Sequence, residues 1–144
     1  MAAGARKDPF AAFRFQVEVT GLIVGGFTEV SGLQVETETE EYREGGVNDY
    51  VHKLPKVTKY PVLVLKRGLT DADALWNWHQ EVVAGRINRK SGSVIMLDEA
   101  GNELWRWTFR DAYPAKWTGP EFRGDSSTVA VETVELVHRG ISKG

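Results

Sequence analysis

The sequence predicts a mainly β protein, an antiparallel β-sandwich or barrel that carries one α-helix. Strand-length segments with alternating apolar and polar residues recur between turn-forming glycines, whereas only residues 71–83 combine helix-forming residues with an apolar stripe at helical spacing. The 144 residues contain no repeat or linker. A chain of this length fits one domain that buries roughly two-thirds of its unfolded surface. We therefore expect a single domain over residues 1–144, with residues 1–9 flexible until docked.

The strands of the first half follow from local patterns. Residues 13–19 alternate without a break, which is typical of a strand with one buried face. Glycines at 21, 25 and 26 then interrupt the pattern, and residues 27–30 are expected to form a short second strand. Residues 61–66 are almost continuously apolar, which predicts a strand that is buried on both faces.

The helix is expected over residues 71–83. Thr70 is positioned to cap it, and acidic residues in the first turn would complement the positive end of the helix dipole. Gly85 is expected to end it. The stripe that faces the core is expected to contain Leu75, Trp78 and Val82.

The second half predicts four further strands, at residues 93–97, 103–110, 113–117 and 128–138. The last strand changes phase, because Val129 and Val131 have the opposite parity to Val134 and Leu136. A β-bulge near residues 132–133 would reconcile the two pairs.

An aromatic cluster accompanies these strands. Its alternation favours a core face that packs on Trp76 and Trp78 of the helix over a carbohydrate-binding platform. The cluster consists of Trp105, Trp107, Phe109 and Trp117.

The segment 34–60 differs from the rest of the chain. Glu36, Glu38 and Glu40 occupy one face of an alternating stretch, the Gly45–Gly46 pair permits a reversal, and lysines follow. Isolated two-stranded hairpins are marginal in water, and this one has few apolar groups, so we expect another chain to stabilise it. Crowded like charges cost some tenths of a kcal/mol per pair, which predicts basic residues of another strand opposite the glutamates.

The composition excludes several function classes. The net charge of −2 argues against a general nucleic-acid binder, and the absence of cysteine excludes disulfides and thiol chemistry. His52, His79 and His138 are too far apart for a zinc motif, and the acidic run lacks a calcium-loop pattern. We predict no catalytic, cofactor-binding or metal-binding residue, and no enzyme.

Two rival functions remain open. One is a monomeric β-barrel that binds a small apolar ligand, which would require an unfilled interior. The other is a hydrolase that uses Glu18 and Glu29 as acid and base, although no local pattern distinguishes them from surface residues.

No apolar run reaches the roughly 18 residues that span a bilayer, and the first residues lack the apolar core of a secretory signal. We expect synthesis in the cytoplasm and no membrane insertion by this chain.

Five segments stand out in order along the chain: residues 13–19, GFTEVSGL at 26–33, EYREGG at 41–46 with KLPK at 53–56, LKRG at 65–68, and VAVETVELVH at 129–138. Together they resemble the contractile-tail tube family. Lys56 departs from the family pattern, where a glycine is expected after Leu54 and Pro55. The similarity extends to the inner-tube proteins of extracellular contractile injection systems and, in fold, to the ring protein of type VI secretion.

The resemblance implies a structural inner-tube protein. Homo-hexameric rings would stack into a hollow conduit inside a contractile sheath, as part of an extracellular injection particle or a phage tail. The implied partners are the sheath, tube paralogues, baseplate and terminator proteins, and a lumenal cargo of effector protein or DNA.

The extended hairpin 34–60 would contact the adjacent ring. We hypothesise that its acidic and basic strands meet across the ring interface. The expected inter-subunit residues are Glu36, Glu38, Glu40, Tyr42, Arg43, Gly45, Gly46, Lys53, Leu54, Pro55, Lys56 and Lys59.

Overall fold

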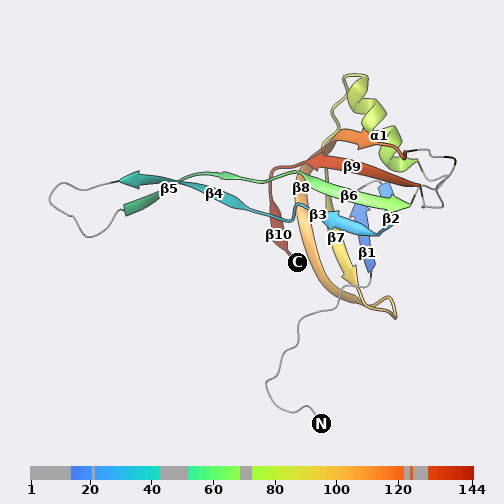
Figure 1. Cartoon of the computed structure of the whole chain (residues 1–144), viewed down its shortest axis with the longest axis horizontal. Coiled ribbons are helices and arrows are strands. Elements are labelled where there is room, and N and C mark those ends of the chain that lie inside the picture. Colours follow the sequence, from blue (N-terminus) through green and yellow to red (C-terminus); the bar gives the residue numbers. More distant parts are fainter. Residues whose placement is uncertain (1–13, 21, 43–51, 69–72, 122–123, 125–129) are drawn as a thin grey trace, which may run out of the picture.

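The computed structural model describes residues 14–20, 22–42, 52–68, 73–121, 124 and 130–144. In these ranges it shows a mainly β fold with one helix, and all strand pairs are antiparallel, so the predicted fold class is confirmed. Figure 1 shows a curved body, with the helix at one end and a two-stranded arm projecting from its side. The strands are β1 (Arg14–Val19), β2 (Leu22–Phe27), β3 (Glu29–Ser31), β4 (Glu36–Tyr42), β5 (His52–Lys59), β6 (Leu63–Gly68), β7 (Lys90–Leu97), β8 (Glu103–Thr118), β9 (Val131–Val137) and β10 (Ile141–Lys143).

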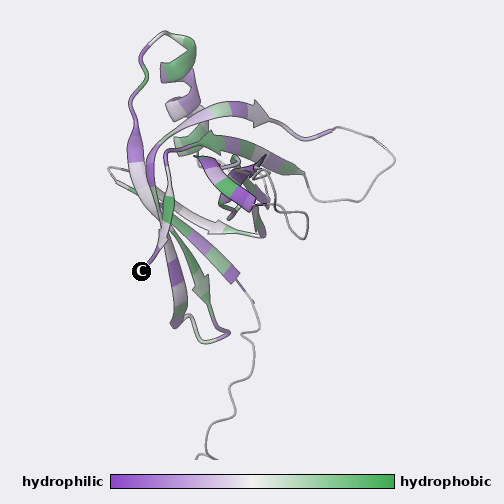
Figure 2. Ribbon diagram, turned by 90° about the vertical axis from the view of Figure 1, so that its left-hand side faces the viewer, coloured by the Kyte–Doolittle hydropathy of each residue, from purple (hydrophilic) through white to green (hydrophobic). Residues whose placement is uncertain are grey.

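The body is one eight-stranded sheet that runs β2-β1-β7-β8-β9-β6-β3, with β10 attached to β8. Apolar and polar residues alternate along its strands (Figure 2). The first strand matches the prediction, since Val17 and Val19 are buried and the residues beside them face solvent or are half-buried.

The prediction for residues 27–30 is wrong. Phe27 ends β2, which pairs with β1, whereas Glu29 begins β3, which pairs with β6. Between them the Thr28 amide donates to the Lys66 carbonyl, so the chain changes partner at this corner. The glycines at 25 and 26 lie within β2, beside a register shift against β1.

One 16-residue strand, β8, replaces the two that were expected between residues 103 and 117. Its first part pairs with β7 and β10, and its second part pairs with β9. Asp111 stands between the two parts with a φ of 52°, a conformation that aspartate tolerates better than most residues. The strand therefore bends without ending.

Two predictions for the other body strands need correction. In β6, Leu63 and Leu65 are buried, whereas the alternate positions, beginning with Val64, are half-buried. Strand β6 therefore has one core face. In β9 the register against β6 is continuous, without the bulge expected at residues 132–133. Glu132 instead occupies a core position, where its carboxylate accepts hydrogen bonds from Arg67 and Trp117.

Helix α1 (Ala74–Val83) begins after Asp73, which forms no side-chain cap. The expected cap Thr70 lies outside the described residues, and the described first turn contains no acid. At the other end the prediction is confirmed, because Gly85 has a φ of 88° and its amide donates to the Val82 carbonyl. The helix packs on β8 and β2 and contributes Leu75 and Trp78 to the core.

The core lies between the sheet and the helix. Gly92 permits a close approach of strands, because a Cβ there would lie 2.7 Å from the Phe109 ring and closer still to the Glu18 carbonyl oxygen. The buried apolar cluster contains Val17, Val19, Phe27, Leu63, Leu65, Leu75, Trp78, Val94, Phe109, Ala112, Val134 and Leu136.

The predicted aromatic cluster is only partly correct. Trp117 meets Trp76 edge-on, with ring centroids 4.7 Å apart, and Phe109 is buried. Trp105 and Trp107 precede Asp111, like Phe109, but they are only half-buried, and their ring centroids lie 6.5 Å apart. Trp117, near the end of β8, therefore packs on the helix, whereas Trp105 and Trp107, near its start, line hollows at the surface.

Candidate assembly interface

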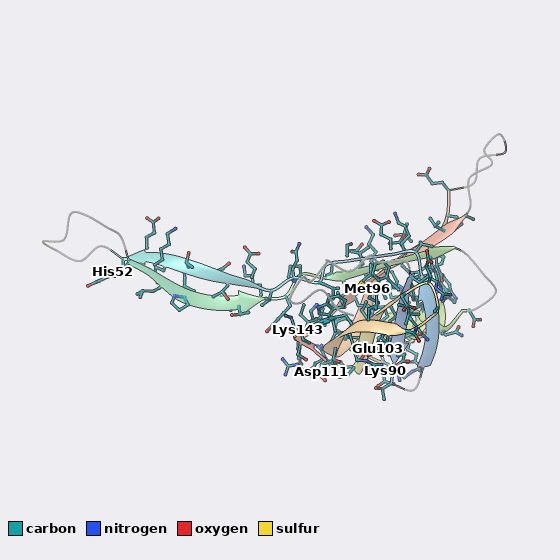
Figure 3. All side chains as sticks on the ribbon, turned by 90° about the horizontal axis from the view of Figure 1, so that it is seen from below. His52, Lys90, Met96, Glu103, Asp111 and Lys143 are labelled. Carbon is teal, nitrogen blue, oxygen red and sulfur yellow. The ribbon has the colours of Figure 1, made fainter. Side chains whose placement is uncertain are left out.

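Strands β4 and β5 form an arm that stands apart from the body sheet. They pair with each other as a separate two-stranded sheet, and no other described strand joins them. Figure 3 shows the arm extending away from the body, with His52 at its far end. A hairpin without a packing layer matches the expectation that this segment lacks stabilisation of its own.

The charges of the arm are partly matched within it. Glu36 stands opposite Lys59, Glu41 stands opposite Lys53, and Lys59 forms an ion pair with Glu38. The hydrogen bond and negative charge of Glu38, with a smaller effect of Glu36, raise the pKa of Lys59. The basic residues predicted opposite the glutamates are therefore supplied by the second strand of the same hairpin. An exposed pair of this kind stabilises only weakly.

Apolar side chains are unusually exposed on the arm. Tyr42, Leu54 and Val57 retain 52%, 49% and 52% of their accessible surface, and Val35 at the base retains 61%. The register pairs Glu40 with Leu54 and Tyr42 with His52. Because directly opposed residues share a face and side chains alternate along a strand, Tyr42 and Leu54 lie on one face with Glu40. The same face also carries Glu36 and Glu38, so the exposed apolar side chains stand among charged ones.

The structure brings most of the predicted inter-subunit residues together on this arm, but it does not test what they contact. Arg43, Gly45 and Gly46 lie outside the described residues. The others occupy β4 and β5: Glu36, Glu38, Glu40, Tyr42, Lys53, Leu54, Pro55, Lys56 and Lys59.

A groove that the sequence did not predict opens where the arm joins the body. It has a volume of about 260 Å³, and a second hollow of about 480 Å³ adjoins it and shares Lys143. The Lys143 ammonium lies 5.4 Å from the Trp105 ring centroid. The groove is lined by Leu33, Val35, Trp107, Ile141, Ser142 and Lys143.

Local sequence signals for this groove are weak. Strand β10 has three residues, which are too few for a periodic pattern. From the sequence, the alternation of Trp105 and Trp107 predicts that both are buried in the core. In the structure both are half-buried, and this follows from the course of β8, which the local sequence does not predict.

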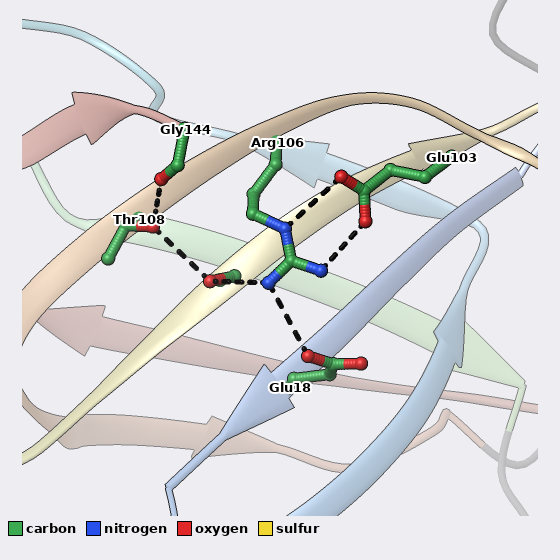
Figure 4. Close-up of polar contacts among 6 residues, drawn as sticks. Glu18, Glu103, Arg106, Thr108 and Gly144 are labelled. Atoms are coloured by element: carbon green, nitrogen blue, oxygen red, sulfur yellow. Dashed lines mark hydrogen bonds and ion pairs between the residues drawn. The ribbon is translucent and has the colours of Figure 1, made fainter.

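The solvent side of β1, β7 and β8 carries a polar network (Figure 4). Arg106 donates to Glu103 through Nη2 at 2.7 Å and lies 3.6 Å from Glu18, while Thr108 donates to the Gly144 carbonyl at 2.6 Å. The hydrogen bond from Arg106 lowers the pKa of Glu103, and the same bond raises the pKa of Arg106. The network links side chains of β1, β7 and β8 with the Gly144 carbonyl on this side of the sheet.

The candidate acid and base of the hydrolase alternative are engaged separately. Glu18 in β1 approaches Arg106, whereas Glu29 in β3 pairs with Lys66 at 3.5 Å. The two strands lie far apart in the sheet order. Within the described residues, no group of side chains is arranged to hold a metal ion, and no helix there is long and apolar enough to cross a membrane.

The fold and the projecting arm place the chain in the class of tail-tube proteins. Solved structures share the architecture over nearly the full chain. A chain in the structure of the tube-terminating cap of the anti-feeding prophage has 27% identity and a TM-score of 0.85, with 100% of this chain and 99% of that chain covered. A chain of the PVC sheath–tube complex, from an extracellular contractile injection system, has 26% identity and a TM-score of 0.84, with 94% and 91% covered.

The chain belongs to the family of T4-like virus tail tube protein gp19, whose model matches residues 11–142. It is therefore a structural component of a tail tube. Hcp1 from Flavobacterium johnsoniae shares the fold at 23% identity and a TM-score of 0.57, over 92% of this chain and 95% of that one. No curated protein sequence matches the chain.

Proposed function

We propose that this single-domain chain forms homo-hexameric rings that stack into the inner tube of a contractile injection particle or phage-like tail. The observation that carries the proposal is the arm, which exposes Tyr42, Leu54 and Val57 and which pairs only with itself among the described strands. An adjacent ring would cover it, with residues 34–60 as the inter-subunit element. The PVC and anti-feeding prophage structures support an assembly of tube, sheath and terminating cap.

Growth would be open-ended. A ring that adds head to tail makes a heterologous contact, and such a contact propagates a filament when it does not close. The described sheet ends at β2 and β3, whose outer edges offer backbone groups to neighbouring subunits within a ring. The contact between rings and the contact within a ring thus both use surfaces that would stay exposed in a monomer.

The role is structural and not catalytic. The carboxylates of the hydrolase alternative are engaged with Arg106 and Lys66, and the work of injection would come from the sheath. Baseplate proteins, tube paralogues and a lumenal cargo of protein or DNA remain predictions from the family resemblance.

The rival ligand-binding barrel is disfavoured by the packing of the body. Leu63, Phe109 and Leu136 are fully buried in a continuous apolar cluster. The groove and its neighbouring hollow open at the surface beside the arm, and Leu33 and Ile141 of the groove pack against the outside of that cluster.

The assembly state tests the proposal. Purified chain should sediment as rings or longer polymers, and electron micrographs should show hollow tubes. A well-folded monomer that persists at high concentration would exclude the tube.

A further inference from the structure

We propose that the groove at the foot of the arm is the receptor for the arm of a second copy of this chain. In this contact Leu54 and Tyr42 of one copy enter the groove, and Glu40 lies beside Lys143 of the other. The inference rests on the proposed function, because it names the surface that each arm meets in the tube.

The arm supplies apolar groups that remain exposed to solvent in the described chain. Of the seven large apolar side chains that the described residues expose, Tyr42, Leu54 and Val57 lie in the arm strands. Tyr42 and Leu54 share a face, so one docking event can cover both. Burial of apolar surface is the main driving force of such an association.

The groove supplies a matching surface. Leu33, Trp107 and Ile141 form apolar walls, and all three are half-buried in the isolated chain. A half-buried tryptophan in a depression is the kind of residue that dominates interface energetics. The lining comes from three separate segments that the body fold holds together.

The positions of arm and groove favour contact between copies. Figure 3 labels His52 at the far end of the arm and Lys143 where the arm meets the body. The seven residues of β4 span roughly 20 Å, since a strand rises about 3.3 Å per residue. The end of each arm therefore lies away from the groove of its own chain. It can reach the groove of a neighbouring copy, and the arm of that copy can reach the groove of the next.

Charge would set the register of the contact. The Glu40 carboxylate shares the arm face with Leu54, and the residue opposite it is apolar rather than basic. Lys143 borders both hollows at the foot of the arm. Opposite charges at the rim of an apolar contact fix orientation more than they add affinity.

Cysteine cross-linking tests the contact directly, because the chain contains no cysteine. Leu54→Cys and Ser142→Cys are made as separate variants, mixed, assembled under reducing conditions and then oxidised. We expect a disulfide-linked species of twice the chain mass in the mixture and not in either variant alone. The matched control replaces Ser142→Cys by Ile87→Cys, because Ile87 is also exposed (55%) but lies beyond the helix. That control mixture should give no dimer.

Electron micrographs of the same samples separate the possible failures. Tubes without the Leu54–Ser142 cross-link would overturn the groove contact and leave the tube function intact. A wild-type chain that forms no polymer would refute the proposed function itself. If the cysteine variants alone fail to assemble, Lys143→Glu decides: a several-fold loss of tube that Glu40→Lys restores supports the contact, and a loss without restoration overturns it.

Discussion

Buried charge in the body is concentrated on Arg67 and Glu132. Their side chains are 7% and 4% exposed, with 2.5 Å between the guanidinium Nε and the carboxylate Oε1. Trp117 donates to the second carboxylate oxygen at 3.1 Å, and the Arg67 guanidinium lies 5.2 Å from the Phe27 ring centroid. These contacts join β6, β8 and β9. The ion pair and the hydrogen bond also offset the desolvation cost of the two buried charges, which is several kcal/mol per ion. The pair fixes how the strands meet.

Removal of one charge of the Arg67–Glu132 pair should therefore lower the free energy of unfolding more than removal of both. We expect Glu132→Ala to lower the free energy of unfolding by about 3–5 kcal/mol, because it leaves a buried guanidinium uncompensated. The double change Arg67→Met and Glu132→Leu should lose much less. Urea unfolding followed by circular dichroism measures both values. Equal losses in the single and double variants would contradict this account.

The β7–β8 turn is closed by one carboxylate. Asp98 accepts from the Asn102 amide at 2.8 Å, and its own amide donates to the Asn102 carbonyl at 3.0 Å. The backbone hydrogen bond from Asn102 lowers the pKa of Asp98, with further contributions from the Asn102 side chain and from Ala100 and Gly101. The turn is thus stabilised by an ionised aspartate.

The contribution of the ionised Asp98 carboxylate to the stability of the fold should disappear at low pH. A carboxyl whose pKa is lower in the folded chain stabilises the fold above its unfolded pKa, about 3.9, and loses this contribution as the pH falls through the folded value. We expect Asp98→Asn to lower the melting temperature at pH 7, and the gap to wild type to shrink below about pH 4. Melting curves of both proteins between about pH 7 and pH 2.5 measure the gap. A gap that is constant over this range would argue against the ionised turn.

Elements with simple periodicity can be predicted from the sequence, and elements that depend on distant partners cannot. The β1 alternation and the apolar stripe of α1 are local signals. The β1 prediction is confirmed, and in the predicted stripe Leu75 and Trp78 are buried whereas Val82 is half-buried. The opposite parity of two apolar pairs predicts a bulge in β9, yet the strand is regular and Arg67 pairs with Glu132 at a core position. Likewise, β8 continues past Asp111 because β7 and β9 pair with its two parts.

The whole molecule separates into a body that packs around its own core and an arm that does not. The arm is visible in the sequence because its charges lie within one contiguous segment. The groove is not, because Leu33, Trp107 and Ile141 come from three segments that meet only in the folded body. The donor surface is therefore local in sequence, whereas the receptor surface is a product of the tertiary fold.

Because body and arm are separate, the arm should be removable without loss of the fold. A variant that joins Val35 to Tyr60 through a short glycine linker should keep a melting temperature close to wild type, because β4 and β5 pair only with each other among the described strands. It should retain the edges of β2 and β3 for contacts within a ring, but it should lose the contact between rings. Sedimentation and electron microscopy should then show species no longer than one ring. The control variant Val83→Ser removes another exposed apolar group (67%), which lies on the helix, and should still form tubes. Full-length tubes from the armless chain would show that the rings stack through another surface.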